Sequence, residues 1–258
     1  MIDLHSHVLP GIDDGPDTIE GSLELARAAV AAGTRTLVAT PHVSWHYPND
    51  ADTIARGVAE LKARLAAEEI ALELLPGAEI AVTRLPELDS AQRSRLRLGA
   101  GPWLLVEPPF APVVSGLERI VLELQSSDGR VLLAHPERCP AIQRDPRMLG
   151  SLVRAGVLTS VTAGSLVGRF GEKVRRFALE LVREELVHNV AADSHDAVDR
   201  PPSIADELRQ AGLEPLAEWL TMSVPTAILE GTEIPPRPVL ALTRPRSRPT
   251  RASWLRRR

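Results

Sequence analysis

Histidine and carboxylate side chains recur where short apolar runs of this sequence end. His5-Ser6-His7 closes the first run. Residues two apart in an extended strand point to the same side, so both imidazoles are predicted to reach one metal ion. Later runs deliver the same residue types at equivalent places, namely His42, Glu79, Glu107, His135, Asp193 and His195. Divalent cations bind imidazole and carboxylate groups, so the pattern predicts a metal centre.

A lone histidine at a strand end is usually capped or solvated, and His42 by itself would carry little weight. Six of the seven predicted strands nevertheless deliver such a residue. Glu107 lies in the apolar stretch LLVEPP, where a buried carboxylate needs a cation or hydrogen-bond partners. Asp13-Asp14-Gly15 alone is typical of a turn. Beside His5 and His7, however, one of these two carboxylates is predicted to reach a second metal ion.

The elements that must position these groups are short β-branched runs that alternate with helical patterns. The predicted strands are Ile2–His5, Thr34–Ala39, Leu72–Ala78, Trp103–Val106, Arg130–Ala134, Leu158–Thr162 and Leu186–Ala191. Near-continuous apolar strands separated by helices indicate a parallel sheet buried on both faces. Seven repeats favour a closed or nearly closed barrel, whose active sites gather at the carboxyl ends of its strands. An open doubly wound sheet is the alternative.

Apolar residues at helical spacing predict the intervening helices. Their ranges are Thr18–Ala32, Ala51–Glu69, Val114–Gln125, Leu149–Ala155 and Gly171–Glu184. Asp17 is predicted to cap the first helix, with Glu20 at the third helical position completing a capping box. Gly33, Gly156 and Gly212 are expected just past helix ends. We expect residues 1–234 to form one domain.

Composition favours a soluble globular protein of the cytoplasm. Hydrophobic residues make up 44% and charged residues 25% of the 258 residues, and aromatic residues only 3%. The single cysteine excludes an internal disulfide, and neither a signal peptide nor an apolar run long enough to span a bilayer is expected.

The formal net charge of −4 is unevenly distributed along the chain. The segment Pro235–Arg258 holds eight arginines and no acidic residue, whereas the first 234 residues carry 22 basic and 34 acidic side chains. This proline- and arginine-rich tail is predicted to be extended or disordered. It is either a solvated extension or a contact for an anionic partner.

Several other catalytic classes are excluded by missing motifs. The sequence contains no GxSxG elbow and no GxxxxGK[ST] phosphate loop. A cysteine phosphatase needs five residues between its thiolate and the arginine that closes the phosphate-binding loop. Only four residues separate Cys139 from Arg144, so Cys139 is predicted to be incidental. His46 lies in a loop with Trp45 and Tyr47, and His188 is predicted to be structural because it falls early in a strand.

The motifs together resemble the PHP (polymerase and histidinol phosphatase) superfamily. The segments MIDLHSHVLPGIDDGP, ATPH, GAEI, AHPER and ADSH…RPP are similar to those of bacterial tyrosine phosphatases of capsule and exopolysaccharide operons. They span residues 1–202 in the family's order. The HxH pair alone is weak because amidohydrolases share it, whereas HSH with DDGP and AHPER is specific.

The resemblance implies a distorted (β/α)7 TIM-like barrel that holds three divalent cations, commonly Mn²⁺, with Fe or Zn as alternatives. It assigns His5, His7, Glu79 and Asp193 to the first cation. Glu79 would bridge to a second cation completed by Glu107 and His135. The third cation would be held by Asp14, His42 and His195, and Arg138 and Arg200 would contact the phosphate.

The expected reaction is in-line attack on phosphorus by a hydroxide held between cations, without a covalent intermediate. A phenolate leaves with a pKa near 10, so strong general-acid assistance is less essential for phosphotyrosine, and no general acid is identified. The implied partner is a phosphotyrosine-bearing protein, namely an autophosphorylating bacterial tyrosine kinase of polysaccharide export. No stable nucleic-acid partner is expected.

One departure from the family concerns the loop after the TPH motif. Relatives that act on phosphotyrosine often carry basic residues there, whereas this loop reads Val43-Ser44-Trp45-His46-Tyr47. Trp45 and Tyr47 either stack on a phenol ring or pack the loop against the barrel. The alternatives are therefore a phosphatase of a small ester such as histidinol phosphate, a nuclease-like relative, and a metal-bound binding module that acts through its tail.

Overall fold

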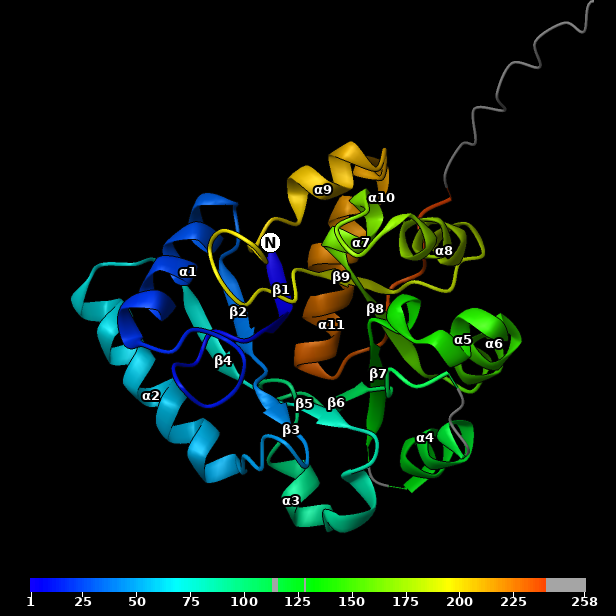
Figure 1. Cartoon of the computed structure of the whole chain (residues 1–258), viewed down its shortest axis with the longest axis horizontal. Helices are drawn as coiled ribbons and strands as arrows, with labels where there is room; N and C mark the ends of the chain where they lie inside the picture. Colours follow the sequence, from blue (N-terminus) through cyan, green and yellow to red (C-terminus); the bar gives the residue numbers. More distant parts are fainter. Residues whose placement is uncertain (113–115, 128, 240–258) are drawn as a thin grey trace, which may run out of the picture.

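The fold of the chain is a mixed α/β arrangement of parallel strands with most helices around its outside (Figure 1). The computed structural model describes residues 1–112, 116–127 and 129–239. One sheet has the order β1-β2-β4 and the other the order β3-β5-β6-β7-β8-β9, and all pairs are parallel. The strands are β1 (Ile2–Ser6), β2 (Thr36–Ala39), β3 (His42–Val43), β4 (Glu73–Pro76), β5 (Glu79–Ala81), β6 (Trp103–Glu107), β7 (Arg130–Ala134), β8 (Leu158–Thr162) and β9 (Asn189–Ala191).

Every strand range predicted from the sequence contains a strand. Two short strands that were not predicted, β3 and β5, follow β2 and β4 after a gap. Pro41 lies in the first gap and has no N–H to donate to a sheet. Gly77 lies in the second gap, where an added Cβ would lie 2.8 Å from a methyl carbon of Val38. Only glycine allows this close packing of the two runs.

The edge strands of the two sheets are joined by backbone hydrogen bonds. Ser6 and Ser194 form an isolated parallel bridge, and the N–H of Asp193 donates to the carbonyl of His5 at 3.0 Å. Asp3, which is fully buried, accepts from the N–H of Ala192 with its carboxylate. These bonds connect the end of β1 with the segment that follows β9.

The helices are connected by short segments and cover the strands. They are α1 (Ile19–Ala31), α2 (Ala51–Ala67), α3 (Ser90–Ser94), α4 (Leu117–Ser127), α5 (Pro140–Arg144), α6 (Pro146–Arg154), α7 (Ala163–Val167), α8 (Glu172–Arg183), α9 (Ala205–Gln210), α10 (Glu214–Glu218) and α11 (Val224–Glu230). Two short 3-10 turns, η1 (Leu85–Glu87) and η2 (Pro136–Arg138), and a π-helical segment, η3 (Trp219–Ser223), complete the set. None of the helices in these ranges is long and apolar enough to cross a membrane.

Each predicted helix range overlaps a helix, but the predicted capping box of the first helix is wrong. Thr18, not Asp17, caps α1, and its hydroxyl accepts from the N–H of Gly21 at 3.2 Å. Both residue types cap well, so the sequence alone does not fix which one adopts the extended cap conformation. The shift moves Glu20 out of the third helical position. Gly33, Gly156 and Gly212 all follow helix ends with positive φ.

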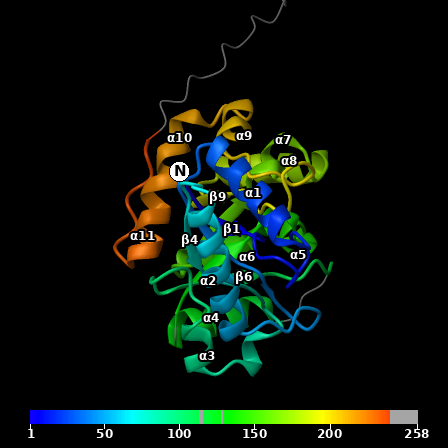
Figure 2. The same ribbon diagram turned by 90° about the vertical axis from the view of Figure 1, so that its left-hand side faces the viewer.

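Helix α11 packs at the amino-terminal end of the strands. It contacts β1, and a Cβ added at Gly101, just before β6, would lie 2.1 Å from the carbonyl oxygen of Ile228. Figure 2 shows α11 along one side of the molecule and α5, α7 and α8 along the other. The carboxyl ends of the strands are left free of α11 and are available for a site.

The first residues of the predicted tail contact the body. The indole N–H of Trp219 donates to the carbonyl of Pro235 at 2.9 Å, and Arg237 donates to the carbonyl of Val182 at 2.8 Å. Residues 240–258 lie outside the described residues, so the prediction of an extended or disordered tail stays a prediction there.

Candidate metal centre

The structure brings all nine predicted ligands together at the carboxyl ends of the strands. Within the described residues, four overlapping groups of side chains converge closely enough to hold a cation. The groups are His7, Asp14, His42 and His195; His5, His7 and Asp193; His5, Glu79 and His135; and His42, Glu79 and Glu107. They come from segments far apart in sequence, so the parallel sheets create the cluster.

The first cluster surrounds the two histidines of the HxH pair. The Nε2 atoms of His5 and His7 lie only 3.3 Å apart. Both nitrogens lie 3.5 Å from Oδ1 of Asp193 and 3.3–3.4 Å from Oε2 of Glu79. All four side chains are buried. Lone-pair donors that face one another in a buried space are what a bound cation requires.

Glu79 also joins a second cluster. Its Oε1 lies 2.7 Å from Nε2 of His135, and its Oε2 lies 3.0 Å from Nδ1 of His42. Glu107 completes the cluster, with one oxygen 3.9 Å from His42 and the other 3.9 Å from His135. Glu79 thus lies between clusters, in keeping with the bridging position that the sequence resemblance implies.

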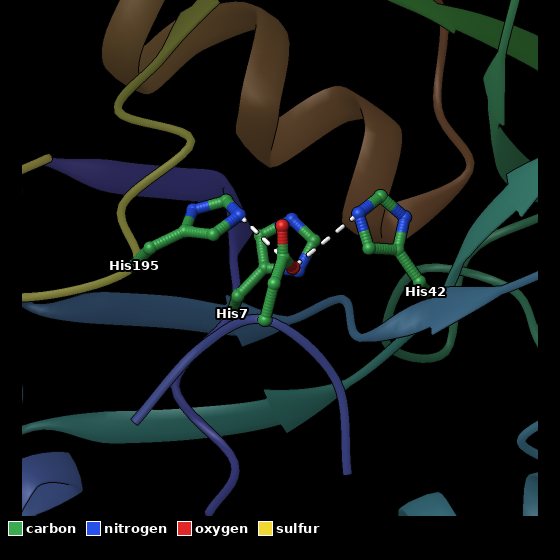
Figure 3. Close-up of side chains that lie close together, drawn as sticks. His7, His42 and His195 are labelled. Carbon is green, nitrogen blue, oxygen red and sulfur yellow. Dashed lines mark ion pairs between the residues drawn. The ribbon is translucent and has the colours of Figure 1, made fainter. Parts of the chain in front are cut away.

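A third cluster gathers around the carboxylate of Asp14. Its Oδ1 lies 3.2 Å from Nε2 of His195, 3.5 Å from Nε2 of His42 and 3.6 Å from Nδ1 of His7. Figure 3 shows His42 and His195 pointing toward this point from opposite sides, with His7 between them. The geometry places His7 near two clusters and His42 near two clusters, whereas the resemblance gives each of them to a single cation.

Asp13 is a residue of this site that the sequence reasoning did not select. Its Oδ2 lies 2.8 Å from Nδ1 of His7 and accepts from the N–H of His42 at 3.0 Å, while its Oδ1 accepts from Gly15. A carboxylate on the far nitrogen of a ligating histidine fixes the ring and its tautomer. The pair Asp13-Asp14 is visible in the sequence, but only the fold shows that Asp13 is the carboxylate that orients His7.

Glycine at position 15 is required by this loop. A Cβ there would lie 2.0 Å from the carbonyl oxygen of His7. The close approach lets the chain return past His7, so that Asp13 and Asp14 reach different imidazoles.

Arg138 and Arg200 meet at one carboxylate. Arg138 donates to Oδ2 of Asp193 at 2.6 Å, and Nη2 of Arg200 lies 2.8 Å from the same oxygen. The other oxygen of Asp193 faces His5 and His7. Asp193 and His135 both have positive φ, 52° and 29°, which non-glycine residues rarely adopt. The backbone turns sharply where it delivers these side chains.

The charges in the cluster perturb each other strongly. Burial opposes ionisation of Glu79, but the neighbouring imidazoles of His5 and His135 hold its pKa well below its usual range. Burial and the Glu79 charge raise the pKa of Glu107 to about 8. A bound cation favours the ionised carboxylate and would reverse that shift.

Several buried polar atoms of the cluster make no hydrogen bond of good geometry among the described residues. Oε2 of Glu79 and Nε2 of His195 have only the ion-pair contacts given above, the nearest at 3.0 Å to His42 and 3.2 Å to Asp14, and Nδ1 of His135 has no hydrogen-bond partner. Unpaired buried polar atoms are costly. Their convergence on imidazole and carboxylate neighbours fits a site for divalent cations.

The remaining sequence candidates lie outside the clusters. Tyr47 stacks on His42, with ring centres 5.5 Å apart and planes 6° apart, whereas Trp45 is 62% exposed. His188 lies at the opposite end of its strand, beside Trp219. Cys139 is buried, its thiol lies 3.4 Å from the carbonyl of Pro109, and burial raises its pKa. A thiol with a raised pKa is a poor nucleophile at neutral pH.

A cavity of about 90 Å³ opens above the clusters. The described residues that line it are Asp14, His42, Glu79, Glu107, Phe110, His135, Arg138, Asp193, His195 and Arg200. It therefore exposes predicted ligands and both arginines to the same small space.

Comparison with known proteins identifies the family. The sequence matches the family "Capsular polysaccharide synthesis, CpsB/CapC" over residues 1–229. It is 40% identical to the tyrosine-protein phosphatase YwqE of Bacillus subtilis over 201 residues, which are 78% of this chain and 79% of that protein. It is 32% identical over 209 residues to the putative tyrosine-protein phosphatase CapC of Staphylococcus aureus, again covering 78% and 79%.

A solved structure is also similar. It comes from work on YwqE from Bacillus subtilis and CpsB from Streptococcus pneumoniae, described as unique metal-dependent tyrosine phosphatases. It superposes with a TM-score of 0.81 at 34% identity, over 93% of this chain and 100% of that chain. The resemblance inferred from the motifs is confirmed. The chain belongs to the CpsB/CapC family of capsular polysaccharide synthesis.

Proposed function

We propose that this protein is a metal-dependent tyrosine-protein phosphatase that acts in the cytoplasm on a phosphorylated protein of capsule or exopolysaccharide synthesis. The observation that carries the proposal is the cluster of nine histidine and carboxylate side chains beside two arginines at the strand ends. The relatives named as tyrosine phosphatases support the same activity. The partner implied is a bacterial tyrosine kinase.

The cofactor proposed is a set of three divalent cations, with Mn²⁺ as the expected metal. His5, His7, Glu79 and Asp193 would hold the first, Glu79, Glu107 and His135 the second, and Asp14, His42 and His195 the third. Bound cations would lower the pKa of a water molecule towards neutrality and offset the charge of the phosphoryl oxygens. The two joined parallel sheets would act as a distorted (β/α)7 barrel that holds this centre.

The two arginines have a role of their own. Arg138 and Arg200 bind one oxygen of Asp193 and also line the cavity. A guanidinium group matches the geometry of phosphate oxygens and stays charged at all relevant pH values. We infer that they orient the phosphoryl group for in-line attack. In the reaction an oxygen from water bonds to phosphorus while the phosphorus–oxygen bond to the tyrosine ring breaks.

We infer that Arg84 supplies positive charge to the loop that lacks basic residues. Its guanidinium carbon lies 4.5 Å from the ring centre of Trp45, in the loop after His42, while the same guanidinium group forms an ion pair with Glu87. This placement supports a protein substrate, because family members that act on phosphotyrosine often carry charge in that loop.

The proposal is tested by substrate comparison with the full chain and added Mn²⁺. A phosphotyrosine peptide is expected to be hydrolysed with a higher kcat/KM than histidinol phosphate, and single-stranded DNA is expected to stay intact. A preference for histidinol phosphate would replace the proposal by the small-ester phosphatase, and cleavage of DNA would replace it by a nuclease.

A further inference from the structure

Phe110 is an apolar side chain in a charged site. It follows Glu107 in the loop after β6, and its side chain is 50% exposed. Nine of the ten described residues that line the cavity are ionisable, and Phe110 is the one apolar residue among them. Its ring can neither bind a cation as a ligand nor move a proton, so its place at the cavity needs another explanation.

The ring of Phe110 is held by two groups of the proposed centre. It stacks on the imidazole of His135, with ring centres 5.6 Å apart and planes 17° apart. The guanidinium carbon of Arg138 lies 5.0 Å from the centre of the Phe110 ring. The ring is thus fixed beside a predicted ligand and a predicted phosphate-binding side chain, while half of its surface stays open.

The size of the cavity places the organic part of a substrate at this ring. Pockets that enclose a whole small molecule measure roughly 300 Å³ or more. The cavity here measures about 90 Å³, which suits a phosphoryl group among cations but not an attached tyrosine ring. Once the phosphoryl group is bound inside, the leaving group must lie at the mouth, where Phe110 is exposed.

We propose that Phe110 is a specificity-determining residue that packs against the aromatic ring of an aryl phosphate. This inference rests on the proposed phosphatase function and adds the residue that selects aryl over alkyl esters. The other aromatic residues near the site are less suited. Tyr47 covers His42 without lining the cavity, and Trp45 packs under Arg84.

A competing explanation is that Phe110 only holds Arg138 in place. Phe170 provides a matched control, because the guanidinium carbon of Arg138 lies 4.3 Å from its ring centre while Phe170 is not among the residues lining the cavity. Loss of either ring would disturb Arg138 and thereby the binding of any phosphoryl group. Only loss of Phe110 would remove a contact with the organic group.

The test measures binding of phenylphosphonate and methylphosphonate to the Mn²⁺-loaded full chain by calorimetry. These probes differ in their organic group and are not hydrolysed. Wild-type protein and Phe110→Tyr are expected to prefer phenylphosphonate, and Phe110→Leu is expected to lose about 3- to 10-fold of that preference, as for a lost aromatic pair. Phe170→Leu is expected to keep the preference, with any loss shared by both probes.

Equal affinity of the wild-type protein for both probes would overturn the inference. A Phe110→Leu protein with unchanged preference would also overturn it, as would a Phe170→Leu protein that loses as much preference as Phe110→Leu. Turnover of a phosphotyrosine peptide by the same wild-type sample distinguishes the two proposals. No turnover contradicts the phosphatase function, whereas turnover with an unchanged preference in Phe110→Leu contradicts only the ring contact.

Discussion

Histidines at the two ends of the strands lie in environments that shift their pKa values in opposite directions. His7, at the carboxyl end of β1, is fully buried, and although burial opposes its protonation, the carboxylates of Asp13, Asp193 and Glu79 raise its pKa well above the usual value. His188, before β9, is mostly buried as well. There, burial and the charge of Arg237 lower the pKa to about 4.

The difference shows that the neighbours, not burial, decide what a histidine can do. The nearest partner of His188 is Thr159, whose N–H donates to Nδ1 at 3.3 Å. No carboxylate oxygen is recorded within ion-pair distance of His188 in the described ranges, whereas His7 lies near four carboxylates. One environment collects predicted cation ligands and the other holds a neutral ring in place.

The largest expected effect follows from removing the carboxylate that links the two halves of the site. Asp193→Ala removes a predicted ligand and the shared partner of Arg138 and Arg200. Turnover of p-nitrophenyl phosphate with added Mn²⁺ should fall by more than about 100-fold, which exceeds the usual cost of losing a hydrogen-bond partner of a metal ligand. Activity within tenfold of wild type, in a protein with an unchanged circular dichroism spectrum, would remove Asp193 from the centre.

A smaller loss is expected from the inner carboxylate of the acidic pair. Asp13→Asn keeps the shape of the side chain but weakens its bond to His7, so both Mn²⁺ affinity and kcat should fall by about 10- to 100-fold. Asp17→Asn, at an exposed position near the same loop, is the matched control and should change neither. Equal behaviour of the two variants would mean that Asp13 does not orient His7.

His188, just before β9, should make the stability of the protein depend on pH without changing its activity. Because the folded state lowers the pKa of His188 from 6.5 to about 4, the unfolded chain binds more protons between these values. Stability supplied by neutral His188 is therefore complete above about pH 6.5 and is lost as pH falls towards 4, by up to about 3 kcal/mol. His188→Gln should show a shallower loss in urea unfolding of the metal-free protein between pH 7 and 4.5. Parallel losses in both proteins would exclude the effect.

The smallest effect is expected at Cys139, a buried thiol that lies close to the metal centre. Cys139→Ser keeps a donor near the carbonyl of Pro109, so turnover should stay within about twofold of wild type. Its cost should appear in the unfolding free energy, at about 1 kcal/mol. A loss of turnover comparable to that of Asp193→Ala would make Cys139 a catalytic candidate.

The sequence predicted the strands and the convergence of histidine and carboxylate side chains at their ends, because both follow from local patterns. Apolar runs located the strands, and the parallel arrangement then implied that residues at their carboxyl ends would meet. The choice between Asp13 and Asp14, the capping of α1 by Thr18, and the sharing of His7 and His42 between clusters depend on tertiary geometry. The pattern also gave no sign that Phe110, in a loop, would line the cavity.

We expect the strand-end cluster to act through bound cations. The most direct measurement is turnover of p-nitrophenyl phosphate by the full chain before metal removal, after complete removal by a chelator, and after Mn²⁺ is restored. Activity should disappear with the metal and return with Mn²⁺, while the protein stays folded throughout. Full turnover by a folded protein that is shown to be free of metal would contradict it.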